Sequence, residues 1–221
     1  MNKLINKFKN ASPAAKASMA LLFANLVLKG LSLISGPIFT RIMTTEQYGI
    51  VSTFLSWQSL LSVIVTLNLS SGVFNNGMLD FKEDRDSFQF SLLVISTGST
   101  GIFFGIFCLF KQTFLKLFEL PDALVYIMFI YFLFVPAYSF WSGRQRYEYK
   151  YKALTIITIA MSIVSMVLGI IAVVLTPSDS DAVAKVFATE GVNVVIGAFF
   201  TIYLLHTSLD FDVNYLTASM P

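Results

Sequence analysis

Long apolar stretches alternate with short polar segments along most of the chain. Each stretch approaches the roughly 20 residues that a helix needs to cross a bilayer. The pattern therefore predicts six membrane-spanning helices, at Ala17–Thr40, Tyr48–Ser70, Phe88–Phe110, Ala123–Gly143, Ala153–Leu175 and Val186–Leu205. Because the connections are short, we expect an all-α, multi-pass membrane protein with almost no part that folds in water.

The composition agrees with this prediction. Hydrophobic residues make up 56% of the 221 residues and charged residues only 13%, and the mean hydropathy is +0.73. A soluble domain of this length does not reach these values. The net charge of +2 is spread over the loops, so nucleic acid is not expected as a partner.

Lys and Arg are shared unevenly between the loops, and loops that stay in the cytoplasm retain them. If the amino terminus is inside, the inner segments hold ten: Lys3, Lys7, Lys9, Lys16, Lys82, Arg85, Arg144, Arg146, Lys150 and Lys152. The outer segments hold four: Arg41, Lys111, Lys116 and Lys185. We therefore expect both termini in the cytoplasm, with residues 1–16 as a basic arm and residues 17–206 as the membrane domain.

A polar stripe runs down the first predicted span. At 100° per residue, six side chains lie within about 40° of one line: Ser18, Asn25, Lys29, Ser32, Gly36 and Thr40. An ammonium near mid-membrane costs about 2.5–3.5 kcal/mol unless it faces water, protein or an anion, so Lys29 should point inward. It either pairs with a carboxylate or extends along its stem to the interface, or it lines a hydrated cavity and meets an anionic substrate.

Pro37 lies near the end of the same span, where its missing backbone donor predicts a kink or a break. In a straight helix Arg41 would lie roughly 140° from the polar stripe. Arg41 therefore reaches the cavity only if the helix is redirected, and otherwise anchors the outer interface.

Polar and small residues in later spans give weaker signals. One face of the fifth span carries small polar residues, for which close helix packing is the favoured interpretation: Thr155, Thr158, Ser162, Ser165 and Gly169. Gly101 and Gly105 form a GxxxG motif, which indicates that a neighbouring helix approaches the third span there.

Charged residues near the fourth and sixth spans add candidates. Glu190 is a candidate for proton or sodium coupling, although a pair with Lys185 or solvation at the interface is favoured. The link 144–152 is strongly basic and is expected to set the topology and touch anionic lipid. Arg144 and Arg146 are secondary candidates for the inner mouth of a cavity. The mixed-charge segment 80–86 predicts a solvated loop.

Several chemistries have no motif here. The chain lacks a GxxxxGK[ST] phosphate loop, an HExxH motif, paired cysteines and clustered histidines. The lone Cys108 falls in the third span, where packing is the favoured interpretation. We therefore expect no metal, no cofactor and no catalytic residue, and a transporter is favoured over an enzyme.

One segment, Ser35–Gly49, resembles the first-helix signature of Wzx-type polysaccharide flippases. The likeness lies in Pro37, in Thr40-Arg41, and in a short acidic turn with Glu46 that ends in Tyr48-Gly49. These belong to the multidrug/oligosaccharidyl-lipid/polysaccharide exporter superfamily. The resemblance implies one six-helix lobe of a two-lobed, V-shaped exporter. The tail at 207–221 resembles the lead into a seventh helix, so we expect a fragment or split protein that needs a carboxy-terminal lobe or a second copy.

The resemblance also implies a function: movement of undecaprenyl-diphosphate-linked oligosaccharide across the bacterial cytoplasmic (inner) membrane, for surface polysaccharide such as lipopolysaccharide or capsule. Lys29, Asn25, Ser32 and Arg41 would contact this substrate. Membrane lipids and polysaccharide assembly enzymes are the other expected partners. The alternatives are a cation-coupled multidrug exporter, the permease of an ATP-driven polysaccharide exporter, and an inactive half-transporter or scaffold.

Overall fold

The computed structural model describes residues 12–207, and every regular element in this range is helical. Most of the expected basic arm (residues 1–11) and the tail 208–221, on which the seventh-helix resemblance rests, lie outside the described residues. The predicted all-α class is confirmed for the part of the chain that is described.

Six helices are long and apolar enough to cross a membrane, which confirms the predicted number. They are α2 (Pro13–Ile42), α3 (Thr45–Val65), α5 (Arg85–Leu109), α7 (Asp122–Tyr147), α8 (Tyr151–Leu175) and α9 (Asp181–Thr207). Three short elements join them, namely α4 (Gly72–Asp80), α6 (Lys111–Phe118) and the 3₁₀ turn η1 (Ser178–Ser180).

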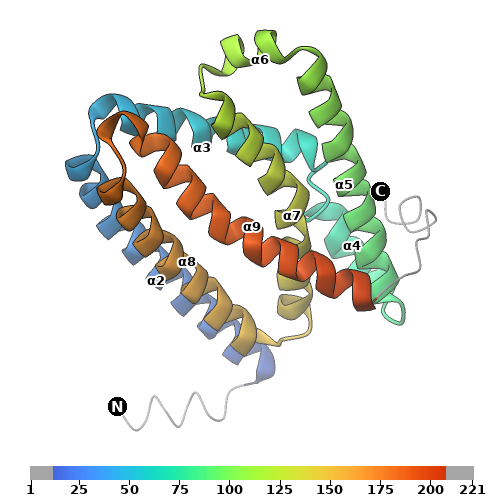
Figure 1. Cartoon of the computed structure of the whole chain (residues 1–221). Helices are drawn as coiled ribbons and strands as arrows, with labels where there is room; N and C mark the ends of the chain where they lie inside the picture. Colours follow the sequence, from blue (N-terminus) through green and yellow to red (C-terminus); the bar gives the residue numbers. More distant parts are fainter. Residues whose placement is uncertain (1–11, 208–221) are drawn as a thin grey trace, which may run out of the picture.

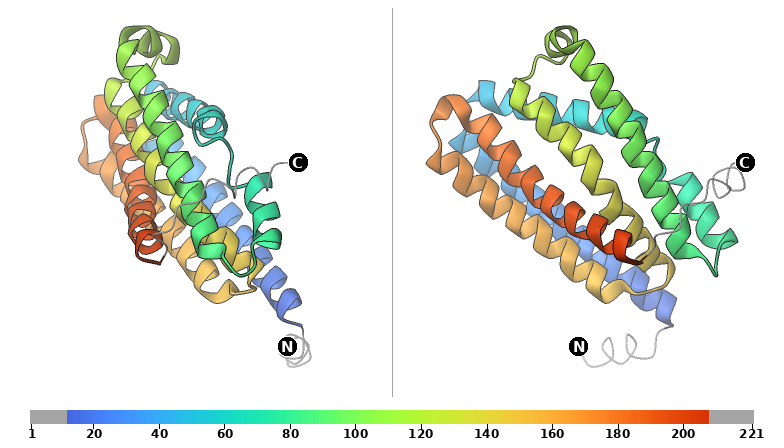
Figure 2. Two further views of the ribbon diagram at one scale, coloured as in Figure 1. Left: turned by 90° about the vertical axis from the view of Figure 1, so that its right-hand side faces the viewer. Right: turned by 45° about the vertical axis from the view of Figure 1, so that its right-hand side comes forward.

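Five long helices lie in a row in the order α2, α8, α9, α7 and α5 (Figure 1). The sixth, α3, crosses behind α9 and α7 and packs against both (Figures 1 and 2). This crossing leaves a space enclosed by α2, α3, α8 and α9. The links α4–α5 and α7–α8 lie at one end of the bundle, which we call the basic end because it carries Arg85, Arg144, Arg146 and Lys150.

Helix ends account for the main differences from the prediction. Ser12 and Thr44 cap α2 and α3, and their hydroxyls accept from the backbone N–H of Ala15 and Gln47. The second span ends at Val65 rather than Ser70, because Leu67 and Asn68 turn the chain with positive φ angles of 54° and 46°. No Gly or Pro marks this turn, so the apolar pattern continues through it.

Proline does not end either helix that contains it. α2 continues through Pro37 to Ile42, so the predicted break is wrong and Arg41 lies in the last turn of the helix. α7 likewise continues through Pro136. Proline lacks the donor that would bond the carbonyl four residues earlier, and the Thr100 hydroxyl of α5 lies 3.5 Å from that oxygen, on Phe132.

Two apolar clusters hold the bundle together. The first lies around α3, α7 and the start of α9, with Phe54, Leu124 and Met128 fully buried. The second lies at the basic end, where Phe88 and Phe140 are buried between α4, α5, α7 and α9. Both clusters contain residues of α7, which is the most buried of the six long helices.

A close backbone approach between two long helices occurs at Gly197 on α9, not at the predicted GxxxG. A Cβ atom added to Gly197 would lie 2.6 Å from the Phe134 carbonyl oxygen of α7. A Cβ at Gly101 or Gly105 would meet no atom within 4 Å, so no helix within residues 12–207 packs closely there and that prediction is wrong for this part of the chain.

We predict that Gly197→Val destabilises the protein, because the clash is with backbone and cannot be relieved by a rotamer change. Overpacking of this kind costs about 1–3 kcal/mol. The thermal unfolding midpoint and membrane abundance should fall. Gly101→Val is the matched control and should leave both unchanged; equal behaviour of the two variants would contradict the packing of α7 on α9.

Candidate functional site

A cavity of about 570 Å³ occupies the space between α2, α3, α8 and α9, with Tyr138 of α7 at its wall. We call it the Lys185 cavity. Its polar lining is Ser32, Ser35, Tyr48, Tyr138, Thr158, Ser162, Ser165, Lys185, Thr189, Glu190 and Asn193. The remaining lining residues are apolar or glycine, so the cavity combines apolar walls with hydroxyl groups, an amide, one carboxylate and one cation.

Lys185 supplies that cation. Its Nζ lies 3.8 Å from the centroid of the Phe39 ring and 5.2 Å from that of Tyr48. Within residues 12–207 it has no carboxylate within salt-bridge distance, so the favoured pair with Glu190 does not form. The ring faces stabilise the ammonium and leave its N–H groups available to an anion.

Glu190 lies on α9 in the same cavity and is only 6% exposed, so the expectation of interfacial solvation is wrong. Its carboxylate accepts a hydrogen bond of 2.9 Å from the Asn193 amide, one turn along the helix. Gln58 of α3 is also buried, at 8% exposure, and its side-chain amide lies beside the Glu190 carboxylate. The carboxylate is thus surrounded by amides rather than by cations.

The polar face of α8 forms the opposite wall. Thr158, Ser162 and Ser165 line the cavity. Thr158 shares a 2.9 Å hydrogen bond with the Tyr138 hydroxyl, and Ser165 donates to the Thr189 carbonyl over 3.4 Å. Packing was the favoured interpretation of this face, and the structure shows that it packs and also lines the cavity.

Of the four substrate-contacting residues predicted on α2, only one lines the Lys185 cavity. Ser32 lines the cavity, whereas Asn25 and Lys29 are exposed about two turns and one turn away and do not line it. No carboxylate within residues 12–207 pairs with Lys29. Arg41 is exposed at the end of α2, outside the cavity. The roles of these three residues stay predictions.

Comparison with known proteins identifies the family. A family model described as "Polysaccharide biosynthesis protein" matches residues 14–219. The chain belongs to this family, that of the Wzx-type polysaccharide flippases. No curated protein and no solved structure matched. The family is one of transporters rather than enzymes, so the Lys185 cavity is a candidate binding site.

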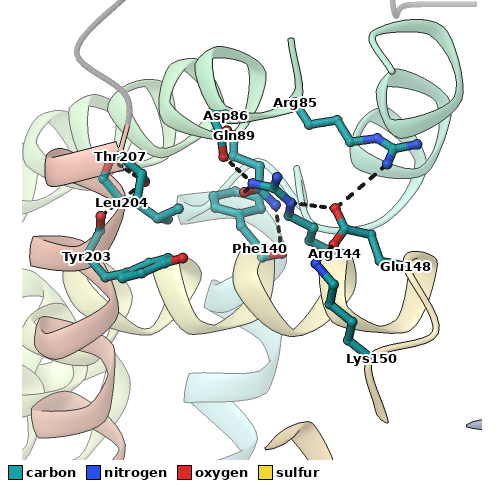
Figure 3. Close-up of polar contacts among 10 residues, drawn as sticks. All are labelled: Arg85, Asp86, Gln89, Phe140, Arg144, Glu148, Lys150, Tyr203, Leu204 and Thr207. Atoms are coloured by element: carbon teal, nitrogen blue, oxygen red, sulfur yellow. Dashed lines mark hydrogen bonds and ion pairs between the residues drawn. The ribbon is translucent and has the colours of Figure 1, made fainter. Parts of the chain in front are cut away.

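A network of ion pairs stabilises the basic end of this flippase-family chain (Figure 3). Arg144 of α7 contacts Asp86 at the start of α5, and its Nε donates to Glu148 over 2.8 Å. Glu148 also pairs with Arg85 at 3.7 Å and with Lys150 at 2.6 Å. Arg85 and Asp86 lie in the first turn of α5. The prediction of a solvated loop at residues 80–86 is therefore wrong for these two residues.

The network also fixes the protonation of Glu148. Partial burial raises the pKa of Glu148, but hydrogen bonds and positive charge from Arg144 and Lys150 outweigh it and hold the pKa below its ordinary value of 4.5. Because the folded pKa is depressed, the stabilisation is complete above 4.5 and is lost as pH falls through the folded pKa. Arg144 is thus held by ion pairs with Asp86 and Glu148, and its expected role at the inner mouth of a cavity stays a prediction.

We predict that Glu148→Gln lowers the thermal midpoint at pH 7 by roughly 2–4 °C, the size expected for partly exposed ion pairs. Below the folded pKa the wild type loses the same charge, so the difference should close. Thermal unfolding in detergent at both pH values measures this. Glu119→Gln, at an exposed position without an ion pair among residues 12–207, is the control, and a difference that persists at acid pH would contradict the electrostatic origin.

Proposed function

We propose that this chain forms the amino-terminal lobe of a flippase for lipid-linked oligosaccharides. Its substrate would be an undecaprenyl-diphosphate-linked repeat unit, moved from the inner to the outer leaflet of the bacterial cytoplasmic membrane for lipopolysaccharide or capsule. The observation that carries the proposal is the unpaired ammonium of Lys185 in a cavity walled by hydroxyl groups. Family membership supplies the class of polymer.

The lining suits each part of such a substrate. A diphosphate that leaves water needs compensating positive charge and hydrogen-bond donors, which the Lys185 ammonium offers. The hydroxyls of Ser162 and Ser165 donate to backbone carbonyls, so their oxygens remain as acceptors for sugar hydroxyls. Ser32 and Asn193 provide further groups for sugar hydroxyls. The polyprenyl tail would remain in the bilayer, so the cavity has to hold only the headgroup.

Lys29 and Asn25 extend this polar surface along α2 beyond Ser32. Because both are exposed in this lobe, we propose that they contribute to a larger central cavity completed by a second lobe or a second copy, with Arg41 at its outer edge. Rocking of the two lobes would then open the cavity to one side of the membrane at a time.

We predict that Lys185→Met reduces surface polysaccharide roughly 10- to 100-fold, because a hydrogen bond to a charged group is worth about 1.5–3 kcal/mol. Lys29→Ala should also reduce it. Immunodetection of surface polymer, normalised to membrane abundance, measures both. Lys116→Met, on exposed α6, is the control. A wild-type amount of surface polymer in both Lys185→Met and Lys29→Ala would remove these ammonium groups from the mechanism.

Glu190 favours one alternative, a cation-coupled exporter of the same superfamily, because it is a buried carboxylate in the cavity. We predict that Glu190→Gln, which keeps the shape and the bond from Asn193, abolishes transport driven by a proton or sodium gradient but leaves substrate binding intact. Flux assays in proteoliposomes with imposed gradients test this. Transport of cationic drugs instead of the lipid-linked sugar would establish the alternative.

A further inference from the structure

A second and larger cavity of about 820 Å³ lies at the basic end, between α4 and α7, and shares no lining residue with the Lys185 cavity. We call it the Arg146 cavity. Its wall from the α3–α4 link and α4 is Ser70, Ser71, Phe74 and Asn75, and its wall from α7 and the following turn is Ser139, Ser142, Gly143, Arg146, Tyr147 and Tyr149. Arg146 is the one charged residue in this lining.

The two arginines of this segment have different surroundings. The Arg144 guanidinium is engaged by Asp86 and Glu148. The Arg146 side chain is exposed, and no carboxylate or carbonyl among residues 12–207 accepts from it. The network that holds Arg144 therefore fixes the end of α7 and leaves the adjacent guanidinium free to bind an anion in the cavity.

Neutral polar groups complete the lining. The side chains of Asn75 and Ser70 make no hydrogen bond within the described residues, and those of Ser139 and Ser142 donate to carbonyls of their own helix. The lining thus presents free donors beside oxygen atoms that can still accept. Phosphate oxygens need hydrogen-bond donors, whereas sugar hydroxyls can use both donors and acceptors.

The turn after α7 brings an aromatic ring to the same wall. Lys150 N–H bonds the Gln145 carbonyl at 2.8 Å and Tyr149 N–H bonds that of Arg146 at 3.3 Å, which is the Schellman arrangement. Tyr149 occupies the left-handed position with φ 56°, where glycine is the usual residue. Tyrosine here places a ring at the cavity that glycine could not supply.

A smaller cavity of about 180 Å³, which we call the extension, lies beside the Arg146 cavity and shares Ser70 and Ser139 with it. Ser96 lines this extension, is 1% exposed, and its hydroxyl has no partner among the described residues. A buried polar atom without a protein partner is normally satisfied by water or by a ligand. The extension therefore holds a polar group beside the Arg146 cavity that water or a ligand hydroxyl could satisfy.

We propose that the Arg146 cavity is a second binding site, for a diphosphate group that carries a sugar, at the end of the lobe predicted to face the cytoplasm. Arg146 and Asn75 bind the phosphate oxygens, and Tyr149 with the serine hydroxyls contacts the sugar. The inference rests on the proposed function, to which it adds a place where the headgroup is captured before it reaches the Lys185 cavity.

The test measures binding to the whole chain in lipid nanodiscs, with three probes: undecaprenyl diphosphate, inorganic diphosphate and phosphatidylglycerol. Arg146→Gln and Asn75→Ala should each weaken diphosphate binding at least 5-fold, and Arg146→Lys should recover part of the loss. Lys152→Gln, an exposed cation on α8 that lines no described cavity, is the matched control and should bind as the wild type does. An unchanged thermal midpoint confirms that each variant is folded.

The probes separate the source of the diphosphate. Arg146-dependent binding of undecaprenyl diphosphate alone supports a lipid-linked ligand, and equal dependence for inorganic diphosphate supports a site that reads the diphosphate itself. Binding that is insensitive to Arg146→Gln, or an equal loss for phosphatidylglycerol, overturns the proposal.

Failure of this site is distinguishable from failure of the proposed function. Lys185→Met is expected to reduce export, as predicted above, yet to retain Arg146-dependent binding of diphosphate. If Arg146→Gln binds normally while Lys185→Met still reduces export, the second site is absent and the flippase function stands.

Discussion

The structure depends on how each charge inside the bundle is compensated, because an ion withdrawn from water is costly unless another group replaces its hydration. The described residues compensate a charge in three ways. Arg144 is paired with two carboxylates, Glu190 is bonded by an amide, and Lys185 lies on two aromatic rings. The first solution rigidifies the packing of α5 on α7, whereas the third leaves a cavity with an accessible ammonium.

The membrane fold could be predicted from the sequence because the length and hydropathy of a span are local properties. The span ends could not, because they depend on distant contacts. The last helix begins at Asp181, five residues before the predicted start, and the N–H of Ala182 in its first turn is bonded at 3.0 Å by the Gln47 side chain of α3. Lys185 was consequently assigned to a loop, although it lies within the helix.

The candidate site shows the same division. Helical periodicity identified which residues share a face of one helix, and Ser32 and Gly36 of the predicted stripe do line the cavity. Periodicity carries no information about which faces meet. The cavity cation therefore comes from α9 and not from Lys29 of α2, and a close helix approach occurs at Gly197, outside the GxxxG motif.

The weak compensation of Lys185 is itself a reason to favour it over Arg144 as a ligand for a transported anion. A carrier must release what it binds, and a group already held by two carboxylates must first lose hydrogen bonds worth about 1.5–3 kcal/mol each when charged. A cation over aromatic rings gives up only about 0.5–2 kcal/mol, and an arriving phosphate need not displace the rings at all. In the proposed flippase, Lys185 would therefore accept an anion at low cost and return to a stable resting contact after release, which a fully paired arginine in the same bundle could not do.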